Sequence, residues 1–249
     1  MDITGNTILI TGGGTGIGRG LAEALHAAGN TVIIAGRRRT PLEAVATAHP
    51  GMHLATLDID DAAAIRDFAA HIAAAHPALN VLINNAGIMR VEEVLTGPDA
   101  LATAEATITT NLLGPIRLTS ALLPHLVAQP KAAVVNVSSG LAFVPRADTP
   151  TYSATKAAIH SYSMSLRHQL RNTAVQVIEL APPLVATDLT PGQRDNPRAL
   201  PLESFIQESM ALLAADPNAA EILVERVLAQ RTAEATGRFV AVFEMINPR

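Results

Sequence analysis

The sequence of 249 residues contains no cysteine and no tryptophan, and aromatic residues make up only 3% of it. Without cysteine the chain has no disulfide, no thiolate-bound metal and no cysteine nucleophile. Its 18 basic side chains are outnumbered by 22 acidic ones, and the net charge of −4 disfavours nucleic-acid binding. No run of about 18 uncharged apolar residues occurs, and no basic region precedes an apolar N-terminal stretch. We therefore expect no membrane span and no signal peptide, and we predict a cytoplasmic protein.

Short β-rich runs alternate with helix-like stretches along the whole chain, which favours one domain over residues 1–249. Hydrophobic residues account for 49% of the sequence, which excludes a disordered chain. The strand-like runs are almost wholly apolar, as in a parallel sheet covered by helices on both faces. The predicted fold is therefore α/β, a three-layer doubly wound Rossmann fold with a seven-stranded parallel sheet. The expected strands are Thr7–Thr11, Thr31–Ala35, His53–Leu57, Val81–Asn84, Ala133–Ser138, Val175–Ala181 and Arg238–Val242.

One segment breaks this rhythm. Residues 186–205 contain three prolines and a glycine, and a loop of that length is usually functional. We expect residues 186–216 to form a substrate-binding loop and lid helices, from which Phe205 and Met210 close over a ligand.

Glycines cluster between the first strand and the first helix, in the run from Thr11 to Gly18. A pyrophosphate needs close backbone approach and free N–H groups at a helix N-terminus, which this arrangement provides. The alternative is a glycine-rich turn that binds no ligand. The spacing of Gly12, Gly16 and Gly18, with Thr15 and Ile17 between them, resembles that of the short-chain dehydrogenase/reductase family.

The end of the second strand indicates which dinucleotide binds. A site for NAD usually places a carboxylate there, whereas this chain has Gly36 followed by Arg37 and Arg38. A guanidinium suits the 2′-phosphate of NADPH (NADP+), with Arg37 the first choice and Arg38 the second. The Thr15 hydroxyl is a further donor. A solvated basic turn is the alternative interpretation.

The family resemblance implies further cofactor contacts. It implies that Asp58 and Ile59 meet the adenine, and the alternative for Asp58 is a helix cap. In the Asn84–Gly87 element, Asn-Asn-Ala-Gly, the resemblance places Asn85, Ala86 and Gly87 beside the nicotinamide ribose, and it assigns Pro182, Val185 and Thr187 to the nicotinamide. Pro183 stands where the family usually has glycine.

Tyr152 and Lys156 are the central pair of the sequence. Residues four apart share a helix face, so the phenol and the ammonium point into the same space. A free tyrosine has a pKa near ~10, and a nearby ammonium is expected to lower that pKa. Ser139, thirteen residues before Tyr152 at a strand end, can orient a substrate oxygen. Ser138 is the neighbouring candidate, and both serines could instead cap the strand end.

Asn111 lies inside a long predicted helix, where asparagine is a poor helix former. The resemblance implies that Asn111 kinks the helix and holds a water linked to the lysine. The alternative is a solvent-facing side chain. With Ser139, Tyr152 and Lys156 it matches the family's tetrad in order and spacing. The eight histidines lack metal-ligand spacing, so we expect no catalytic metal.

Several further segments resemble a narrower set within the family, the DltE-like oxidoreductases. The resemblance implies an NADPH-dependent reductase that acts reversibly on a ketone or aldehyde and forms a homodimer or homotetramer. Alternatives are a C=N reductase, a non-catalytic NADP(H)-binding sensor or scaffold, and a sugar-nucleotide epimerase or dehydratase. A hydrophobic small-molecule carbonyl substrate is expected, and the candidate pocket walls are Met89, Leu141, Phe143, Leu184 and Leu189.

Overall fold

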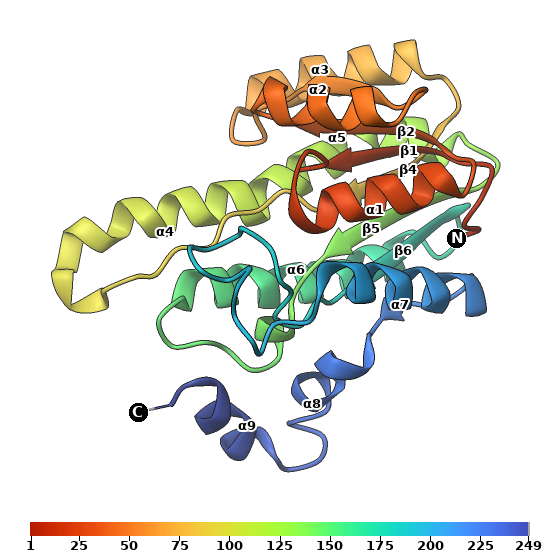
Figure 1. Ribbon diagram of the computed structural model, residues 1–249. Coiled ribbons are helices and arrows are strands. Elements are labelled where there is room, and N and C mark those ends of the chain that lie inside the picture. Colours follow the sequence, from red (N-terminus) through yellow and green to blue (C-terminus); the bar gives the residue numbers. More distant parts are fainter. Residues whose placement is uncertain (249) are drawn as a thin grey trace.

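The strands form one parallel sheet in the order β3-β2-β1-β4-β5-β6-β7 (Figure 1). The computed structural model describes residues 1–248, with the backbone alone at residues 98–100. This confirms the predicted α/β doubly wound fold and its seven strands. The strands are β1 (Thr7–Thr11), β2 (Thr31–Gly36), β3 (His53–Thr56), β4 (Leu79–Asn84), β5 (Ala132–Val137), β6 (Val175–Leu180) and β7 (Glu221–Ile222).

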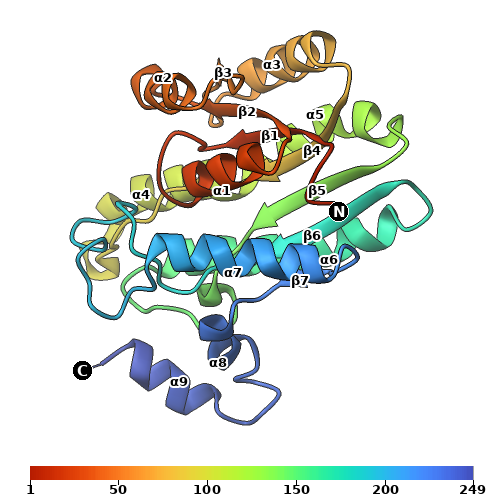
Figure 2. The ribbon, with the colours of Figure 1, turned by 45° about the vertical axis from the view of Figure 1, so that its right-hand side comes forward.

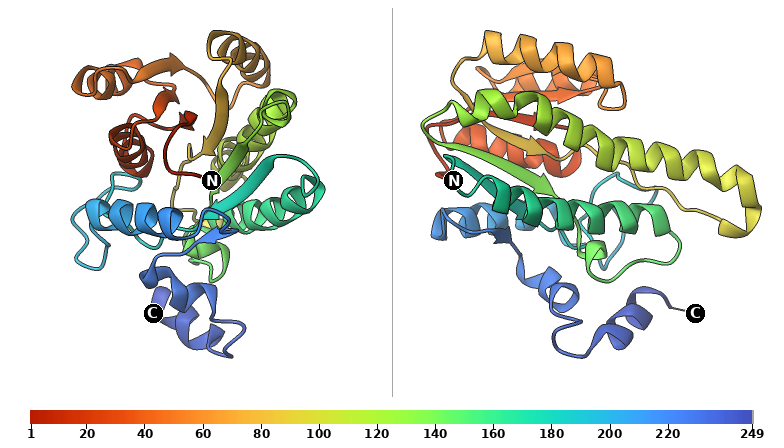
Figure 3. Two further views of the ribbon diagram at one scale, coloured as in Figure 1. Left: turned by 90° about the vertical axis from the view of Figure 1, so that its right-hand side faces the viewer. Right: turned by 180° about the vertical axis from the view of Figure 1, so that it is seen from behind.

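Helices cover both faces of the sheet because successive strand residues point to opposite sides. In β1, Ile8 and Ile10 pack with α1 (Gly16–Ala27), α2 (Arg39–Ala48) and α7 (Leu202–Ala215). Leu9 points the other way, into a second core that belongs to α3, α5 and α6. Figure 3 (left) shows these two helical layers on either side of the sheet. The helices of the second layer are α3 (Ala62–Ala75), α5 (Gly114–Val127) and α6 (Pro150–Gln169).

A long helical arm extends from the second layer. It begins with the 3-10 turn η1 (Val94–Ala100) and continues through α4 (Leu101–Ile108) and the π-helical turn η2 (Thr109–Leu113) into α5. Figure 1 shows α4 reaching beyond the end of the sheet. Among the described residues, no helix combines the length and apolar character needed to cross a membrane.

The predicted seventh strand, Arg238–Val242, is wrong, because those residues open helix α9 (Phe239–Ile246). The run contains β-branched and aromatic residues, but its apolar positions 239, 242, 243 and 246 recur at helical spacing. Val242 is buried against Val144 and Ala233. The sheet edge beside β6 is occupied by the two-residue strand β7. Figure 2 shows β7 at that edge, with α8 (Leu228–Arg231) and α9 beyond it.

The segment 186–216 is only partly what the sequence predicts. It is irregular up to Pro201, and a bridge between Val185 and Leu200 closes it as a loop. From Leu202 it is helix α7, which packs against α1. Phe205 is fully buried in the core, so its predicted place in a lid is wrong. This apolar side chain covers the sheet rather than a ligand.

β1 lies between β2 and β4, so the strands that follow β1 are added on one side of it up to β3 and on the other side from β4 onwards. In an open parallel sheet, the crevice at the carboxyl ends of such strands is the usual ligand site. The glycine run after β1 and the residues Asn85, Ala86 and Gly87 after β4 both line this crevice.

Candidate active site

The glycine loop turns sharply out of β1 and enters α1. Gly12 and Gly16 have φ angles of 68° and 53°, a region that favours glycine. At Gly18 a Cβ atom would collide with the Gly12 carbonyl and the Asn85 amide. The first N–H groups of α1 have no intrahelical acceptor, and the N-cap Thr15 does not use its side chain as a cap. The loop therefore presents backbone donors and a hydroxyl to whatever lies above it.

Asn85 holds this loop to the end of β4. Its Nδ2 donates to the Thr11 carbonyl over 2.9 Å, and its backbone N–H donates to Thr11 Oγ1 over 3.0 Å. Ala86 N–H donates to the same hydroxyl over 3.1 Å. These bonds fix the positions of Asn85, Ala86 and Gly87 relative to the glycine loop.

Arg37 and Arg38 line both cavities that open above the loop. The smaller cavity, of about 150 Å³, is also lined by Gly36, Leu57 and Ile59. No carboxylate stands at the end of β2, because that position is Gly36. The Arg37 guanidinium lies 3.4 Å from the Asp60 carboxylate, a loose and largely exposed pair.

Asp58 is not itself in the wall of either cavity, although its neighbours Leu57 and Ile59 line the smaller one. Its exposed carboxylate accepts a hydrogen bond from the Asp60 N–H over 3.1 Å. The predicted alternative, a helix cap at Asp58, is wrong, whereas the contact of Asp58 with the adenine stays a prediction. Asp61 caps α3 by accepting from the N–H groups of Ala63 and Ala64.

The larger cavity has a volume of about 570 Å³ and continues from the glycine loop to the ends of β5 and β6. It brings together most of the residues singled out in the sequence. They are Gly12, Thr15, Gly16, Ile17, Arg37, Arg38, Asn85, Ala86, Gly87, Ser139, Tyr152, Lys156, Pro182, Val185 and Thr187.

Tyr152 and Lys156 occupy the first turns of α6, where Pro150 begins the helix with a preset φ angle. Both side chains are buried, and the Lys156 ammonium lies 5.5 Å from the centre of the Tyr152 ring. Lys156 Nζ donates to the Val137 carbonyl over 2.8 Å. Ser139 follows β5 and accepts a hydrogen bond from the Leu141 N–H.

Burial changes the acidity of both groups. It raises the pKa of Tyr152 to about 12, while a hydrogen bond with Ser139 acts in the opposite direction. Burial lowers the pKa of Lys156 to about 8, and the nearby Glu179 carboxylate opposes that change. The predicted lowering of the tyrosine pKa is therefore wrong here, since loss of water on burial outweighs the hydrogen bond with Ser139. At neutral pH the phenol keeps its proton and the ammonium keeps its charge.

Asn111 lies in the π-helical turn between α4 and α5 and is buried. Its side chain accepts from the Ile88 N–H and donates to the Ile88 carbonyl, each over 2.8 Å. It also donates to Thr155 Oγ1 over 3.4 Å. The solvent-facing alternative is wrong, and the wider π turn is what lets an interior asparagine reach the loop after β4.

The substrate end of the cavity differs from the predicted walls. Met89 and Leu189 line it, whereas Leu141, Phe143 and Leu184 lie outside its wall. The Phe143 ring packs against His160, with 5.0 Å between ring centres, on the side of β6. Sequence reasoning missed three polar lining residues, Arg90, Asp188 and Gln193. Arg90 follows the Asn84–Gly87 element by three residues, and this closeness in sequence could have indicated that Arg90 lines the cavity.

The chain is similar to known proteins in both sequence and fold. A family model described as short chain dehydrogenase matches residues 6–198. The uncharacterized oxidoreductase DltE of Bacillus subtilis is 41% identical over 251 aligned residues, covering 99% of this chain and 98% of the relative. The NADP-dependent 3-hydroxy acid dehydrogenase YdfG of Salmonella typhi is 34% identical over 72% of each chain. A short chain dehydrogenase of Burkholderia cenocepacia, solved in complex with NADP, has a TM-score of 0.81 and 25% identity over the full length of both chains.

Proposed function

The chain belongs to the short-chain dehydrogenase family, an oxidoreductase family, and on that premise we propose that it is an NADPH-dependent carbonyl reductase. The observation that carries the proposal is the placement of Ser139, Tyr152 and Lys156 on the wall of the cavity that the glycine loop also lines. A phenol that keeps its proton stands there beside an ammonium. This is the arrangement that delivers a proton to an oxygen as its negative charge develops.

The residues present fit an NADPH molecule. The positive φ angles of Gly12 and Gly16 and the uncapped start of α1 suit a pyrophosphate. Arg37 and Arg38 suit the 2′-phosphate, and Gly36 supplies no carboxylate to repel it. Relatives solved with NADP, such as the Burkholderia protein at 25% identity, support the same choice.

When bound, NADPH supplies a hydride to the carbonyl carbon. The Ser139 hydroxyl donates to the carbonyl oxygen and orients it. Tyr152 gives its proton to that oxygen, so the C=O bond becomes CH–OH and the tyrosine is left as a phenolate. The Lys156 ammonium stabilises the phenolate and is expected to hold the nicotinamide ribose. Alcohol oxidation uses the same groups in reverse, with the phenolate taking the proton.

Two kinds of substrate follow from the lining residues. Met89, Pro183 and Leu189 favour a hydrophobic ketone or aldehyde. Arg90 lines the same end and favours an anionic carbonyl compound, and a relative named as a 3-hydroxy acid dehydrogenase points the same way. Two aldehydes of equal length, one ending in a carboxylate and one in a neutral amide, separate these classes. If the anionic class is correct, Arg90→Gln lowers kcat/KM by about tenfold for the carboxylate alone, the loss of one charge-assisted hydrogen bond.

The reductase is tested by following NADPH absorbance with a panel of ketones, aldehydes, diketones and cyclic imines. Tyr152→Phe removes the proton donor and is expected to lower the rate by about 10²–10⁴-fold. Turnover of imines alone would favour C=N reduction instead. Tight NADPH binding without turnover of any compound would contradict the reductase and favour a nucleotide-binding sensor.

A further inference from the structure

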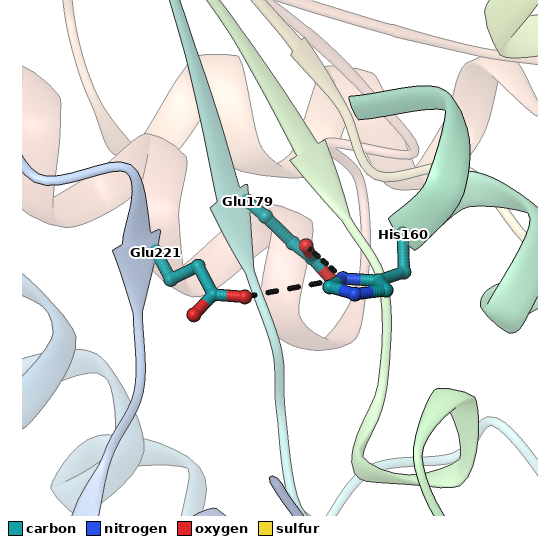
Figure 4. A group of neighbouring side chains, drawn as sticks. All are labelled: His160, Glu179 and Glu221. Carbon is teal, nitrogen blue, oxygen red and sulfur yellow. Dashed lines mark hydrogen bonds and ion pairs between the residues drawn. The ribbon is translucent and has the colours of Figure 1, made fainter. Parts of the chain in front are cut away.

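A buried carboxylate lies behind the cavity, on the last residue but one of β6. Glu179 is 1% exposed and stands opposite Asn136 of β5 in the sheet register. A carboxylate buried in this way is costly unless both oxygens find donors. One oxygen accepts from Ser138 Oγ over 2.5 Å, and the other lies 2.7 Å from Nδ1 of His160 (Figure 4).

These contacts join the two elements that carry the proposed catalytic groups. Ser138 and the adjoining Ser139 follow β5, and Val137 before them accepts the hydrogen bond from Lys156 Nζ. His160 lies one helical turn after Lys156 on α6. Glu179 therefore touches the segment that presents Ser139 on one side and the helix that presents Tyr152 and Lys156 on the other. Its charge also raises the pKa of Lys156 against the effect of burial.

A metal ion is not the best interpretation of this cluster. Glu221 of β7 approaches His160 Nδ1 to 3.9 Å, so three potential ligand atoms gather there. Both oxygens of Glu221, however, accept hydrogen bonds from the Arg231 guanidinium at 3.1–3.2 Å. That guanidinium also stacks over Phe143 and already balances the charge of Glu221. The contacts of Glu179 are instead with Ser138 and His160, and Lys156, one turn before His160 on α6, lies close enough for the Glu179 charge to raise its pKa.

We propose that Glu179 is a positioning residue for the reaction: its carboxylate fixes the Val137–Ser139 segment through Ser138 and holds the positive charge on Lys156. The role in the reaction rests on the proposed function, whereas the effect on Lys156 does not. The ionisable groups around Glu179 are His160 and Lys156 on α6, Glu221 on β7 and Arg231 on α8. Of the two carboxylates, it is Glu179 whose charge raises the pKa of Lys156.

The test uses the fact that the chain has two lysines, Lys131 and Lys156. Protein labelled with ¹³C-lysine gives two side-chain signals, and Lys131→Arg assigns them. The Lys131 side chain is 82% exposed and serves as an internal reference. In the unchanged protein we expect Lys156 to titrate near pH 8.

Glu179→Gln removes the charge and keeps the shape of the side chain. The Lys156 titration is expected to move about one unit lower, a tenfold change in the protonation equilibrium, while Lys131 does not move. Glu221→Gln is the matched control, since Glu221 also faces His160 but has no bond to Ser138, and it leaves Lys156 unchanged. An unchanged Lys156 titration in Glu179→Gln overturns the proposal. If that variant does not fold, Glu179→Asp is used, which keeps the charge but moves it away by one methylene. It is expected to lower the Lys156 titration by a smaller amount. An unchanged Lys156 titration in Glu179→Asp also overturns the proposal.

The same variants then show whether the effect reaches the reaction. With NADPH and a turned-over carbonyl, Glu179→Gln moves the alkaline limb of kcat/KM to lower pH by the same amount. A purely structural role lowers the rate equally at every pH and leaves the limb where it was. An inactive unchanged protein would count against the reductase alone, because the NMR titration needs no turnover.

Discussion

Lys156 is the residue whose state decides the pH range of the proposed reaction. Burial lowers its pKa from 10.5 to about 8, and the ammonium is the active form. As pH rises through 8 the charge is lost, so kcat/KM for reduction is expected to fall about tenfold per unit above that point. Tyr152 contributes no loss in this range, because its pKa is raised to about 12.

Lys156→Arg checks this assignment. Arginine stays protonated throughout, so the alkaline limb near pH 8 is expected to disappear, although the rate at neutral pH falls with the altered geometry. Rates measured from pH 6 to pH 10 decide the matter. A limb that persists near pH 8 in the arginine variant would belong to another group.

Arg37 is the residue on which the choice of nucleotide depends. Arg37→Ala removes a charge-assisted bond to the 2′-phosphate, so KM for NADPH is expected to rise about tenfold or more while KM for NADH changes little. Arg39→Ala is the matched control, because Arg39 pairs with Glu43 and lies outside both cavities. Equal losses for both nucleotides would contradict the assignment of the phosphate to Arg37.

Among single residues, those that carry a specific chemistry could be predicted from the sequence. Tyr152, Lys156 and the glycine loop stand at fixed spacings, and the structure brings them to one cavity. Glu179 was missed because nothing local marks it, since its partners Ser138 and His160 lie 41 and 19 residues away. Leu141 and Phe143 were misplaced for a related reason. Closeness to Ser139 in sequence does not fix on which side of β6 a side chain packs.

Among the elements, α5 is placed by a contact that only glycine permits. At Gly114 a Cβ atom would lie 2.6 Å from the Ile59 side chain and 2.9 Å from the Ile59 carbonyl. Ile59 lines the smaller cavity, so α5 supports the wall of the nucleotide site at this point.

Gly114→Ala is therefore expected to lower the free energy of unfolding by about 1–2 kcal/mol, since overpacking outweighs the better helix propensity of alanine. The affinity for NADPH falls with it. Denaturant unfolding and NADPH titration measure the two effects, and Ser120→Ala, exposed on the same helix, is the control. A variant as stable as the unchanged protein would show that the loop at Ile59 yields freely.

Elements were predictable where their periodicity was unambiguous. Six strands begin and end within two residues of the predicted bounds, because each is a short apolar run between helices. The run at 238–242 was ambiguous, since four or five apolar residues suit a strand or a helix equally. Its helical state is decided by Val144 and Ala233, which Val242 meets only after folding. Strand β7, with two residues, is too short to give a pattern.

For the molecule as a whole, we propose that α5 and α6 pair with those of a second copy to make the homodimer or homotetramer expected from the resemblance. Apolar side chains are exposed along this layer, among them Leu113 and Val127 at 37% and 41% and Met164 at 48%. Figure 3 (right) shows α4 and α5 joined end to end as one long rod, with α6 running beside it.

Met164→Glu places a charge in that contact and is expected to shift the mass measured by light scattering towards one chain. Met245→Glu is the control, because Met245 is 62% exposed but lies on α9. A single-chain mass for the unchanged protein, or loss of assembly in the control alone, would contradict the pairing.

The order of the strands also bears on how the chain is made on the ribosome. The glycine loop, complete by residue 18, is held by Asn85 and faces Thr187, whose side chain would lie 3.6 Å from a Cβ atom placed on Gly16. β1 pairs with β4, so one edge of β1 stays open until Asn84 has been synthesised. At roughly 5–20 residues per second, the synthesis of the chain from the end of β1 at Thr11 to Asn84 lasts about 4–15 s. The nascent chain is therefore expected to keep the backbone N–H and C=O groups on that edge of β1 unpaired for several seconds, and such an edge is a template for pairing with another chain.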